Sequence, residues 1–338
     1  MKRPVLAPLM PVYAAALAVR NYRLAHGGER VRQLRWPVVS VGNLSTGGAG
    51  KTPFVMALAQ LMAQNGWHVD VLSRGYGRSN RRALLVNPAG TAAEFGDEPL
   101  LIARSTGLNV YVASQRYQAG LMAEAQSEQA AGNHRSVHLL DDGFQHRQLF
   151  RTVDILLLNR QDLVDHLLPA GNLREPLLAL HRATVLAIPE DEPEVEHYLR
   201  EIISVGHGVE QPRWTGPIWR LRRSMHIPAE MEDVPVAAFC GIAHPEPFFA
   251  GLGAAGVKVV ACLPFADHHR YTARDLDRLL ALARKNSASA LITTEKDWVR
   301  MGPEVARLRS AMPLHTAVLR TEIDDESSAL AWLEWRLN

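Results

Sequence analysis

A glycine-rich turn, VGNLSTGGAGKTPFV at residues 41–55, has the residue types of a loop that binds a nucleotide phosphate. A short β-branched run, residues 37–41, precedes it and a segment with helical spacing follows it, which is the context that such a loop requires. The Lys51 amine can reach the β- and γ-phosphates, and the Thr52 hydroxyl can bind Mg²⁺. The turn departs from the G-x-x-x-x-G-K-[ST] pattern at Ser45, where a glycine is expected. We predict that the nucleotide is bound by Ser45, Thr46, Gly47, Gly48, Ala49, Gly50, Lys51 and Thr52.

Two adjacent carboxylates, Asp141 and Asp142, directly follow an apolar run in the segment SVHLLDDGFQH. They would emerge at the carboxyl end of a strand, which is the edge where α/β sheets bind their ligands. A carboxylate there can hold the Mg²⁺ that bridges nucleotide phosphates, directly or through water. An Asp-Asp-Gly turn with no ligand is the alternative. Because the phosphate-binding turn lies upstream, we interpret both residues, with Thr52, as the metal region.

Two further groups of polar residues have more than one interpretation. Asp97 and Glu98 precede a proline and an apolar helical segment, so they can simply stabilise the N-terminus of that helix. Asp267, His268 and His269 follow a predicted strand, but neighbouring side chains of an extended chain point to opposite faces and rarely share one ion. We therefore favour a histidine that orients an acid across a cleft between two domains over a metal site here.

The elements that must position these residues alternate between apolar strands and helical stretches. This alternation predicts an α/β fold with a mostly parallel sheet and helices on both of its faces. The strand pattern is interrupted from residue 189 to residue 234 by a segment that is first acidic and then rich in Trp and Arg. We predict a nucleotide-binding domain at 36–188, a linker at 189–234 and a second, smaller α/β domain at 235–338. The predicted strands are residues 37–41, 69–73, 83–86, 110–113, 137–140, 154–158, 184–188, 234–240, 257–263, 290–294 and 315–319.

Composition limits the class of protein. The chain has 338 residues, of which 47% are hydrophobic, so it can bury a large core in one or two domains. Its formal net charge of +2 gives no reason to expect a nucleic-acid partner, and no protein partner is indicated. Cys240 and Cys262 are the only cysteines, which excludes a disulfide framework or a cysteine-rich zinc site and fits a reducing, cytosolic side.

The first 35 residues combine an apolar stretch, residues 4–19, with basic flanks. As a transmembrane helix the stretch is short against the ~20 residues that a bilayer needs, and Pro8 and Pro11 interrupt it. A signal peptide would carry a nucleotide-binding loop away from its nucleotide. A helix packed on the protein's own core is also consistent with the pattern. We favour a membrane-associating segment, an apolar helix that lies on the bilayer surface while the arginines that follow face anionic head groups.

Eight motifs occur in the order, and with the separations, of one enzyme family. They are NLSTGGAGKTPF, LSRGYGR, GDEP, QRYQAG, DDGFQH, LLPAGNLREP, FADHHRYT and TTEKDWVR. Through them the chain, from about residue 5 to residue 320, resembles the tetraacyldisaccharide 4'-kinases (lipid A 4'-kinases) of Gram-negative bacteria. Serine at the first loop position belongs to the pattern of that family, so Ser45 agrees with it.

The resemblance implies a fold, a reaction and a location. The fold is two α/β domains joined by a short β linker. The reaction transfers the γ-phosphate of ATP, with Mg²⁺, to the 4'-hydroxyl of a tetraacylated glucosamine disaccharide 1-phosphate, which gives lipid IVA in lipid A biosynthesis. The enzyme would be peripheral, at the cytoplasmic side of the inner membrane.

The resemblance also implies roles for single residues. Asp97 and His268 would form a pair that handles the proton of the acceptor. Lys51, Arg116 and Arg174 would serve catalysis, which is reasonable because a loose phosphoryl transition state needs positioning and positive charge more than covalent chemistry. Residues that would bind the lipid substrate are Tyr76, Gln145, His146 and Glu175.

Two alternatives stay open on the residues alone. The first is a membrane-associated GTPase or ATPase switch, because LLLNRQDLV resembles the guanine-reading Asn-Lys-x-Asp motif at residues 159–162, although Arg160 replaces the lysine. The second is a kinase of another small molecule, which would not depend on lipid or detergent.

Overall fold

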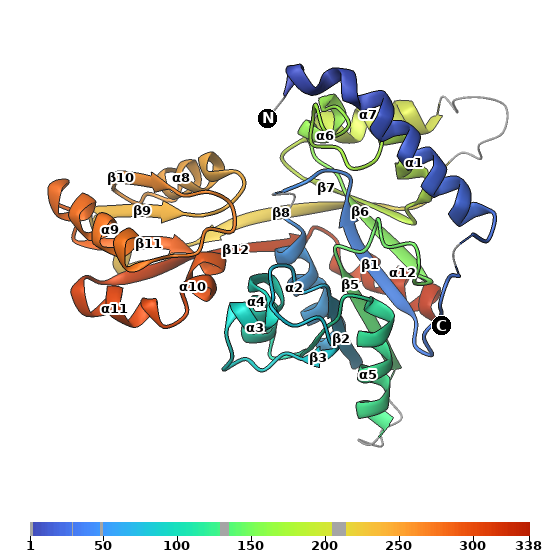
Figure 1. Ribbon diagram of the computed structural model, residues 1–338, viewed down its shortest axis with the longest axis horizontal. Coiled ribbons are helices and arrows are strands. Elements are labelled where there is room, and N and C mark those ends of the chain that lie inside the picture. Colours follow the sequence, from blue (N-terminus) through green and yellow to red (C-terminus); the bar gives the residue numbers. More distant parts are fainter. Residues whose placement is uncertain (1–2, 29, 48–49, 129–134, 205–213) are drawn as a thin grey trace.

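One twisted sheet runs through the whole molecule (Figure 1). The computed structural model describes residues 3–338 apart from 29, 48–49, 129–134 and 205–213. Its sheet has 12 strands in the order β10-β9-β11-β12-β8-β7-β6-β1-β5-β2-β4-β3. Strand pairing is parallel except between β3 and β4 and between β8 and β12. The predicted α/β class with a mostly parallel sheet is therefore confirmed.

The larger lobe is built on strands that are mostly apolar and buried, with single polar residues such as Ser40 and Asp70 among them. Residues such as Val39 and Val41 face one side of the sheet and belong to one core cluster, whereas Val38 and Leu140 belong to another. Strands buried on both faces read as continuous apolar runs, which is why the sequence shows them clearly. They are β1 (Val38–Asn43), β2 (Trp67–Ser73), β3 (Leu84–Leu85), β4 (Asn109–Val112), β5 (Arg135–Asp141), β6 (Val153–Leu157) and β7 (Val185–Pro189).

Helices cover both faces of this part of the sheet. Helices α2 and α4 pack with one core cluster, and α5 packs with the cluster on the opposite face. The N-terminal η1 and α1 lie along the outside of the lobe (Figure 1), and Tyr13 of α1 contacts the loop at residues 170–175. The elements are η1 (Pro4–Leu9), α1 (Met10–Ala25), α2 (Lys51–Gln64), α3 (Ala92–Phe95), α4 (Asp97–Thr106), α5 (Arg116–Glu128), α6 (Arg160–Val164), η2 (Leu177–Arg182) and α7 (Pro193–Ser204).

The smaller lobe repeats the α/β arrangement around its own core. Helix α9 packs with one core cluster of this lobe and α8 with the other. The elements are η3 (Ala229–Met231), β9 (Val236–Cys240), α8 (Pro245–Ala254), β10 (Val259–Pro264), α9 (Ala273–Lys285), β11 (Ala290–Thr294), α10 (Glu295–Met301), α11 (Glu304–Ala311) and β12 (Leu314–Ile323).

Two long strands join the lobes. Strand β8 (Ile218–His226) pairs in parallel with β7 and antiparallel with β12, from Leu221 opposite Ile323 to His226 opposite Val318. The sequence interpretation treated this region as a linker with only a weak strand pattern, because its outward-facing residues are mostly charged. The domain boundaries themselves stay predictions.

The C-terminal helix returns to the larger lobe. Helix α12 (Glu326–Leu337) packs beside α2, and Leu333 is buried in the same core cluster as the strands of that lobe. The Trp332 ring meets the Trp219 ring of β8 edge to face at 6.1 Å between centroids. The sequence division assigned these residues to the second domain, and nothing in their pattern indicates which lobe they contact.

We expect Leu333→Ala to lower the free energy of unfolding by about 2–5 kcal/mol, because it leaves a cavity in the core of the larger lobe. Trp335→Ala is the matched control on the same helix, since Trp335 is largely exposed and its loss is expected to change stability by no more than about 0.5 kcal/mol. Denaturant unfolding measures both. Equal effects of the two changes would contradict the packing of α12.

Candidate active site

The glycine-rich turn connects β1 to the N-terminus of α2 at the carboxyl edge of the sheet. Gly47 and Gly50 have φ angles of 87° and 74°, values that glycine adopts without a steric penalty. Lys51 begins α2, and its Nζ donates a 2.8 Å hydrogen bond to Asn43 Oδ1. Thr52 is buried in the first turn of the helix. Gly48 and Ala49 lie outside the described residues.

Asp141 ends β5 opposite Val41 of β1, so it lies next to the turn. Its Oδ2 accepts a hydrogen bond from Ser73, and its buried Oδ1 has no hydrogen-bond partner within the described part of the chain. Burial, with Glu98 and Asp142 nearby, raises the pKa of Asp141 to about 7. A buried carboxylate oxygen without a partner, among other acids, fits a site for a cation.

The donor set suits Mg²⁺ that is shared with a nucleotide. Across the described residues, no three His, Cys, Asp or Glu side chains converge as they would in a site made by protein alone. Mg²⁺ usually has one or two carboxylates, several waters and the phosphates of the substrate as its ligands. Asp141 and the Thr52 hydroxyl can supply the protein part of such a shell.

Asp142 is the centre of a group of positive charges. Lys51 Nζ lies 3.5 Å from its Oδ1, and Arg174 Nη1 donates to its Oδ2 at 2.9 Å. Burial opposes ionisation, yet Lys51 and Arg174 outweigh it and lower the pKa of Asp142 to about 2. Asp142 therefore stays ionised and holds both cations beside the turn.

Asn43 was missed by the sequence interpretation, although it lies within the quoted turn. It is fully buried, and its Oδ1 accepts from both Lys51 and Arg174. Its carbonyl oxygen accepts from Gln145 Nε2 at 2.9 Å. A buried amide at the end of an apolar strand is the signal that could have identified it, because buried polar groups need partners.

Arg116 and His146 add to the positive side of the site. Arg116 begins α5 and is buried, and burial together with Arg74 lowers its pKa to about 10. Its Nε has no hydrogen-bond partner among the described residues, so it can bind a phosphate oxygen. Burial, Arg116 and Arg151 lower the pKa of His146 to about 4. The imidazole is therefore neutral at pH 7 and can exchange hydrogen bonds with a sugar hydroxyl.

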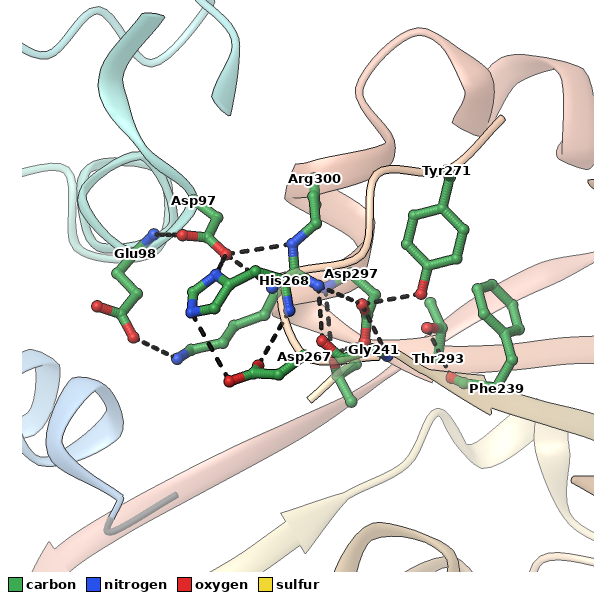
Figure 2. A network of polar contacts seen from close by, with 12 residues as sticks. Asp97, Glu98, Phe239, Gly241, Asp267, His268, Tyr271, Thr293, Asp297 and Arg300 are labelled. Atoms are coloured by element: carbon green, nitrogen blue, oxygen red, sulfur yellow. Dashed lines mark hydrogen bonds and ion pairs between the residues drawn. The ribbon is translucent and has the colours of Figure 1, made fainter. Parts of the chain in front are cut away.

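Asp97 and His268 meet across the two lobes (Figure 2). Asp97 is the first residue of α4, and His268 lies in the loop after β10. His268 Nδ1 is 2.9 Å from Asp97 Oδ2. The hydrogen bond to Asp97 raises the pKa of His268. The Tyr76 ring lies 5.3 Å from the imidazole and is largely exposed. The structure thus brings the predicted pair into contact.

The pair lies next to the metal region. Glu98 follows Asp97 on α4 and is close enough to Asp141 to raise its pKa. The second lobe also approaches the turn itself, since a Cβ added at Gly47 would lie 3.1 Å from Ala243 Cβ in the loop before α8. The phosphate-binding turn and the Asp97–His268 pair therefore belong to one site between the lobes.

Glu175 is placed differently from the other predicted substrate-binding residues. It is fully buried, Arg182 Nη1 donates to it at 2.7 Å, and Arg20 of α1 lies 3.4 Å away. Tyr13 of α1 also donates a 2.9 Å hydrogen bond to the carbonyl oxygen of Arg174. Glu175 therefore joins α1 to the loop that carries Arg174, and its contact with substrate stays a prediction.

The motif at residues 159–162 caps the N-terminus of a helix. Asn159 Oδ1 accepts from the Asp162 N–H at 3.1 Å, and Asp162 Oδ2 accepts from the Asn159 N–H at 3.0 Å. This reciprocal capping box begins α6 and uses the side-chain oxygens that a guanine reader would need. The geometry gives no support to the GTPase alternative.

Comparisons with known proteins agree with this site. The profile of the family described as tetraacyldisaccharide-1-P 4'-kinase matches residues 2–338. The chain belongs to this family. Two relatives named tetraacyldisaccharide 4'-kinase come from Koribacter versatilis and Geobacter metallireducens. The first is 39% identical over 96% of both chains, and the second is 38% identical over 95% of this chain and 94% of its own.

A solved member of the family has the same fold. It is the "apo" form of LpxK from Aquifex aeolicus in complex with ATP, with a TM-score of 0.74 and 29% identity over 99% of both chains. The similarity covers both lobes.

We expect Lys51→Ala to abolish phosphoryl transfer and leave the protein folded with a cooperative melting transition, because it removes charge from the phosphates and no part of the apolar core. Lys258→Ala, a change at an exposed lysine of the smaller lobe, is the control and should keep full activity. Radiolabelled phosphate transfer and a melting curve measure the two properties. A fully active Lys51→Ala enzyme would contradict the assignment of the turn.

Proposed function

We propose that this protein transfers the γ-phosphate of ATP to the 4'-hydroxyl of a tetraacylated glucosamine disaccharide 1-phosphate, which gives lipid IVA in lipid A biosynthesis. The observation that carries the proposal is one site that combines a phosphate-binding turn with a carboxylate–histidine pair from opposite lobes. Membership of the family and the ATP complex of a relative support it.

The residues of the site can each take a part in this reaction. Lys51, Arg116 and Arg174 offer N–H groups and positive charge to the phosphates, and the described turn residues Ser45, Thr46, Gly47 and Gly50 surround them. Asp141 and Thr52 would hold Mg²⁺, which neutralises charge on the phosphates when bound. Gln145, His146 and Tyr76 would contact the sugar.

Asp97 would accept the hydrogen bond, and then the proton, of the 4'-hydroxyl. The 4'-oxygen forms a bond to the γ-phosphorus while the bond from that phosphorus to the bridging oxygen of ADP breaks. The transition state is loose, so the hydroxyl keeps most of its proton until late. Orientation of the hydroxyl then matters more than the strength of the base, which agrees with a carboxylate that is already ionised.

Attachment to the cytoplasmic face of the inner membrane is part of the proposal. Val12, Val19 and Tyr22 are exposed, and their spacing places them on one side of α1. The opposite face is held to the larger lobe by Tyr13 and Arg20, as described above. No helix of the described residues is long and apolar enough to cross a bilayer. These features support a peripheral helix that lies on the membrane.

The proposed activity is tested with γ-labelled ATP and purified tetraacyldisaccharide 1-phosphate in detergent micelles. We expect label in the lipid, no transfer after chelation of Mg²⁺ and recovery when Mg²⁺ is returned. Asp97→Asn should lower kcat by about 10²-fold or more, the effect of removing a general base, with little change in KM for ATP. Equal transfer to an unacylated glucosamine disaccharide phosphate, or none to the lipid, would favour a kinase of another small molecule.

Membrane contact is tested with a double change, Val12→Ser with Val19→Ser. Since each valine that enters an apolar phase contributes up to about 1.5 kcal/mol, we expect at least a severalfold loss of co-sedimentation with anionic vesicles. The apparent KM for the lipid should rise. Thermal stability should not change, because both side chains are exposed.

The control is Leu121→Ser on the exposed face of α5, which should leave vesicle binding as it is. Unchanged co-sedimentation of the double variant would show that α1 does not make the membrane contact.

A further inference from the structure

A buried guanidinium from the smaller lobe also reaches Asp97 (Figure 2). Arg300 lies in the last turn of α10. Its Nη2 and Nε donate to Asp97 Oδ2 at 2.7 Å and 3.2 Å. The exposed fractions of the two side chains are only 6% and 7%, so solvent screens this ion pair little. Removal of one partner of such a buried ion pair is strongly destabilising, because it leaves the other charge buried and unpaired.

The other edge of Arg300 is fixed within its own lobe. Nη1 donates to the carbonyl oxygen of Gly241 at 2.7 Å and to Asp297 Oδ1 at 2.9 Å. Asp297 is fully buried, and the same oxygen accepts from the Tyr271 hydroxyl and the Gly241 N–H. The direction of the guanidinium is therefore set by β9, α10 and the loop before α9, independently of Asp97.

These contacts determine how the Asp97 carboxylate lies. Oδ2 is occupied by Arg300 and His268, and Oδ1 accepts one hydrogen bond within the described chain, from the Glu98 N–H at 3.0 Å. A carboxylate oxygen can accept two hydrogen bonds. One acceptor position on Oδ1 is therefore left for another donor, and the plane of the carboxylate is held from both lobes.

We propose that Arg300 is a positioning residue for phosphoryl transfer, which holds the Asp97 carboxylate from the opposite lobe so that one oxygen stays available to the acceptor hydroxyl. The proposal rests on the proposed function, and it adds a residue that acts through Asp97 without contact with the reacting atoms.

The electrostatics of the pair agree with this role. Burial disfavours the ionised carboxylate, but the hydrogen bond from His268 and the charge of Arg300 outweigh it and lower the pKa of Asp97 well below its usual range. Asp97 is thus ionised at any pH at which the enzyme works. A lysine could supply the charge but not the planar fork that contacts Asp97, Asp297 and Gly241 together.

A second contact shows that α10 is the element through which the smaller lobe holds α4. Lys296 lies one turn before Arg300 on the same face of α10, and its Nζ is 2.5 Å from Glu98 Oε1. Two consecutive acids of α4 are therefore paired with two cations of α10. Arg300 differs from Lys296 in that it is also bound firmly to its own lobe.

The test compares Arg300→Gln and Arg300→Lys in the full-length enzyme and in the Asp97→Asn variant. In the wild-type background we expect Arg300→Gln to lower kcat by about tenfold or more, since small displacements of reacting groups have large effects on rate. KM for ATP should stay within about twofold, and Arg300→Lys should recover part of the loss. In the Asp97→Asn background Arg300→Gln should cost less than about threefold further, because residues that act as a unit are not additive.

A structural role would give a different result. If Arg300→Gln lowers kcat by the same factor with and without the Asp97 carboxylate, or leaves kcat at the wild-type value, the inference is overturned. Melting curves are recorded for every variant, and Arg300→Lys carries the test if Arg300→Gln does not fold. Arg307→Gln, at the exposed pair with Asp277, is the control and should be fully active.

The result also separates this inference from the proposed function. Failure of the wild-type enzyme to label the lipid would reject the function. A labelled lipid together with an Arg300→Gln enzyme of normal kcat would reject only the role of Arg300.

Discussion

The antiparallel pairing of β8 with β12 is the constraint on which the rest of the structure depends. Through it the sheets of both lobes become one, and the site is made where the lobes face each other. The larger lobe supplies the glycine-rich turn, Asp141 and Asp97, and the smaller lobe supplies His268 and Arg300, which both contact Asp97. Because these are the two strands that cross between the lobes among the described residues, the geometry of the site depends on this strand pair and on the ion pairs of α10.

The carboxylates of the site differ in how far neighbouring basic side chains neutralise them. Asp97 is buried and Asp142 is half-buried, and each stays ionised because two basic side chains contact it. Asp141 forms no ion pair within the described part of the chain, and burial raises its pKa, so it fits a site for a further positive charge. Within one small region the protein therefore has carboxylates that neutralise its own cations and one that fits a bound cation.

Much of the fold could be predicted from the sequence, because strands buried on both faces appear as apolar runs and a glycine-rich turn before a helix has few other uses. The carboxylates after β5 were found in the same way. Strand β8 gave only a weak strand pattern because charged residues such as Arg220 and Arg222 alternate along it and pair with acids on neighbouring elements. The position of α12 depends on packing between residues more than a hundred apart, such as Trp219 and Trp332, which no local pattern contains.

Contacts between residues far apart in the sequence also limit prediction of the site. Single motifs indicate which residue types are present, and the resemblance indicated that Asp97 and His268 act together. Arg300 belongs to one of the quoted motifs, but its role needs three partners on separate segments, at Asp97, Gly241 and Asp297. The role of Asn43 likewise depends on distant partners, because its side-chain oxygen accepts from Lys51 and Arg174 and its carbonyl oxygen from Gln145.

The contacts of α1 with the loop of Arg174 have a consequence for how the enzyme finds its substrate. A helix that is bonded to the rim of the site, and not attached by a flexible tether, fixes the height and tilt of the cleft above any surface on which it lies. With the proposed membrane attachment, the enzyme would search for its lipid in two dimensions. Its rate of encounter would depend on the surface density of the lipid, and a sugar whose acyl chains stay in the bilayer would need to rise only as far as the rim.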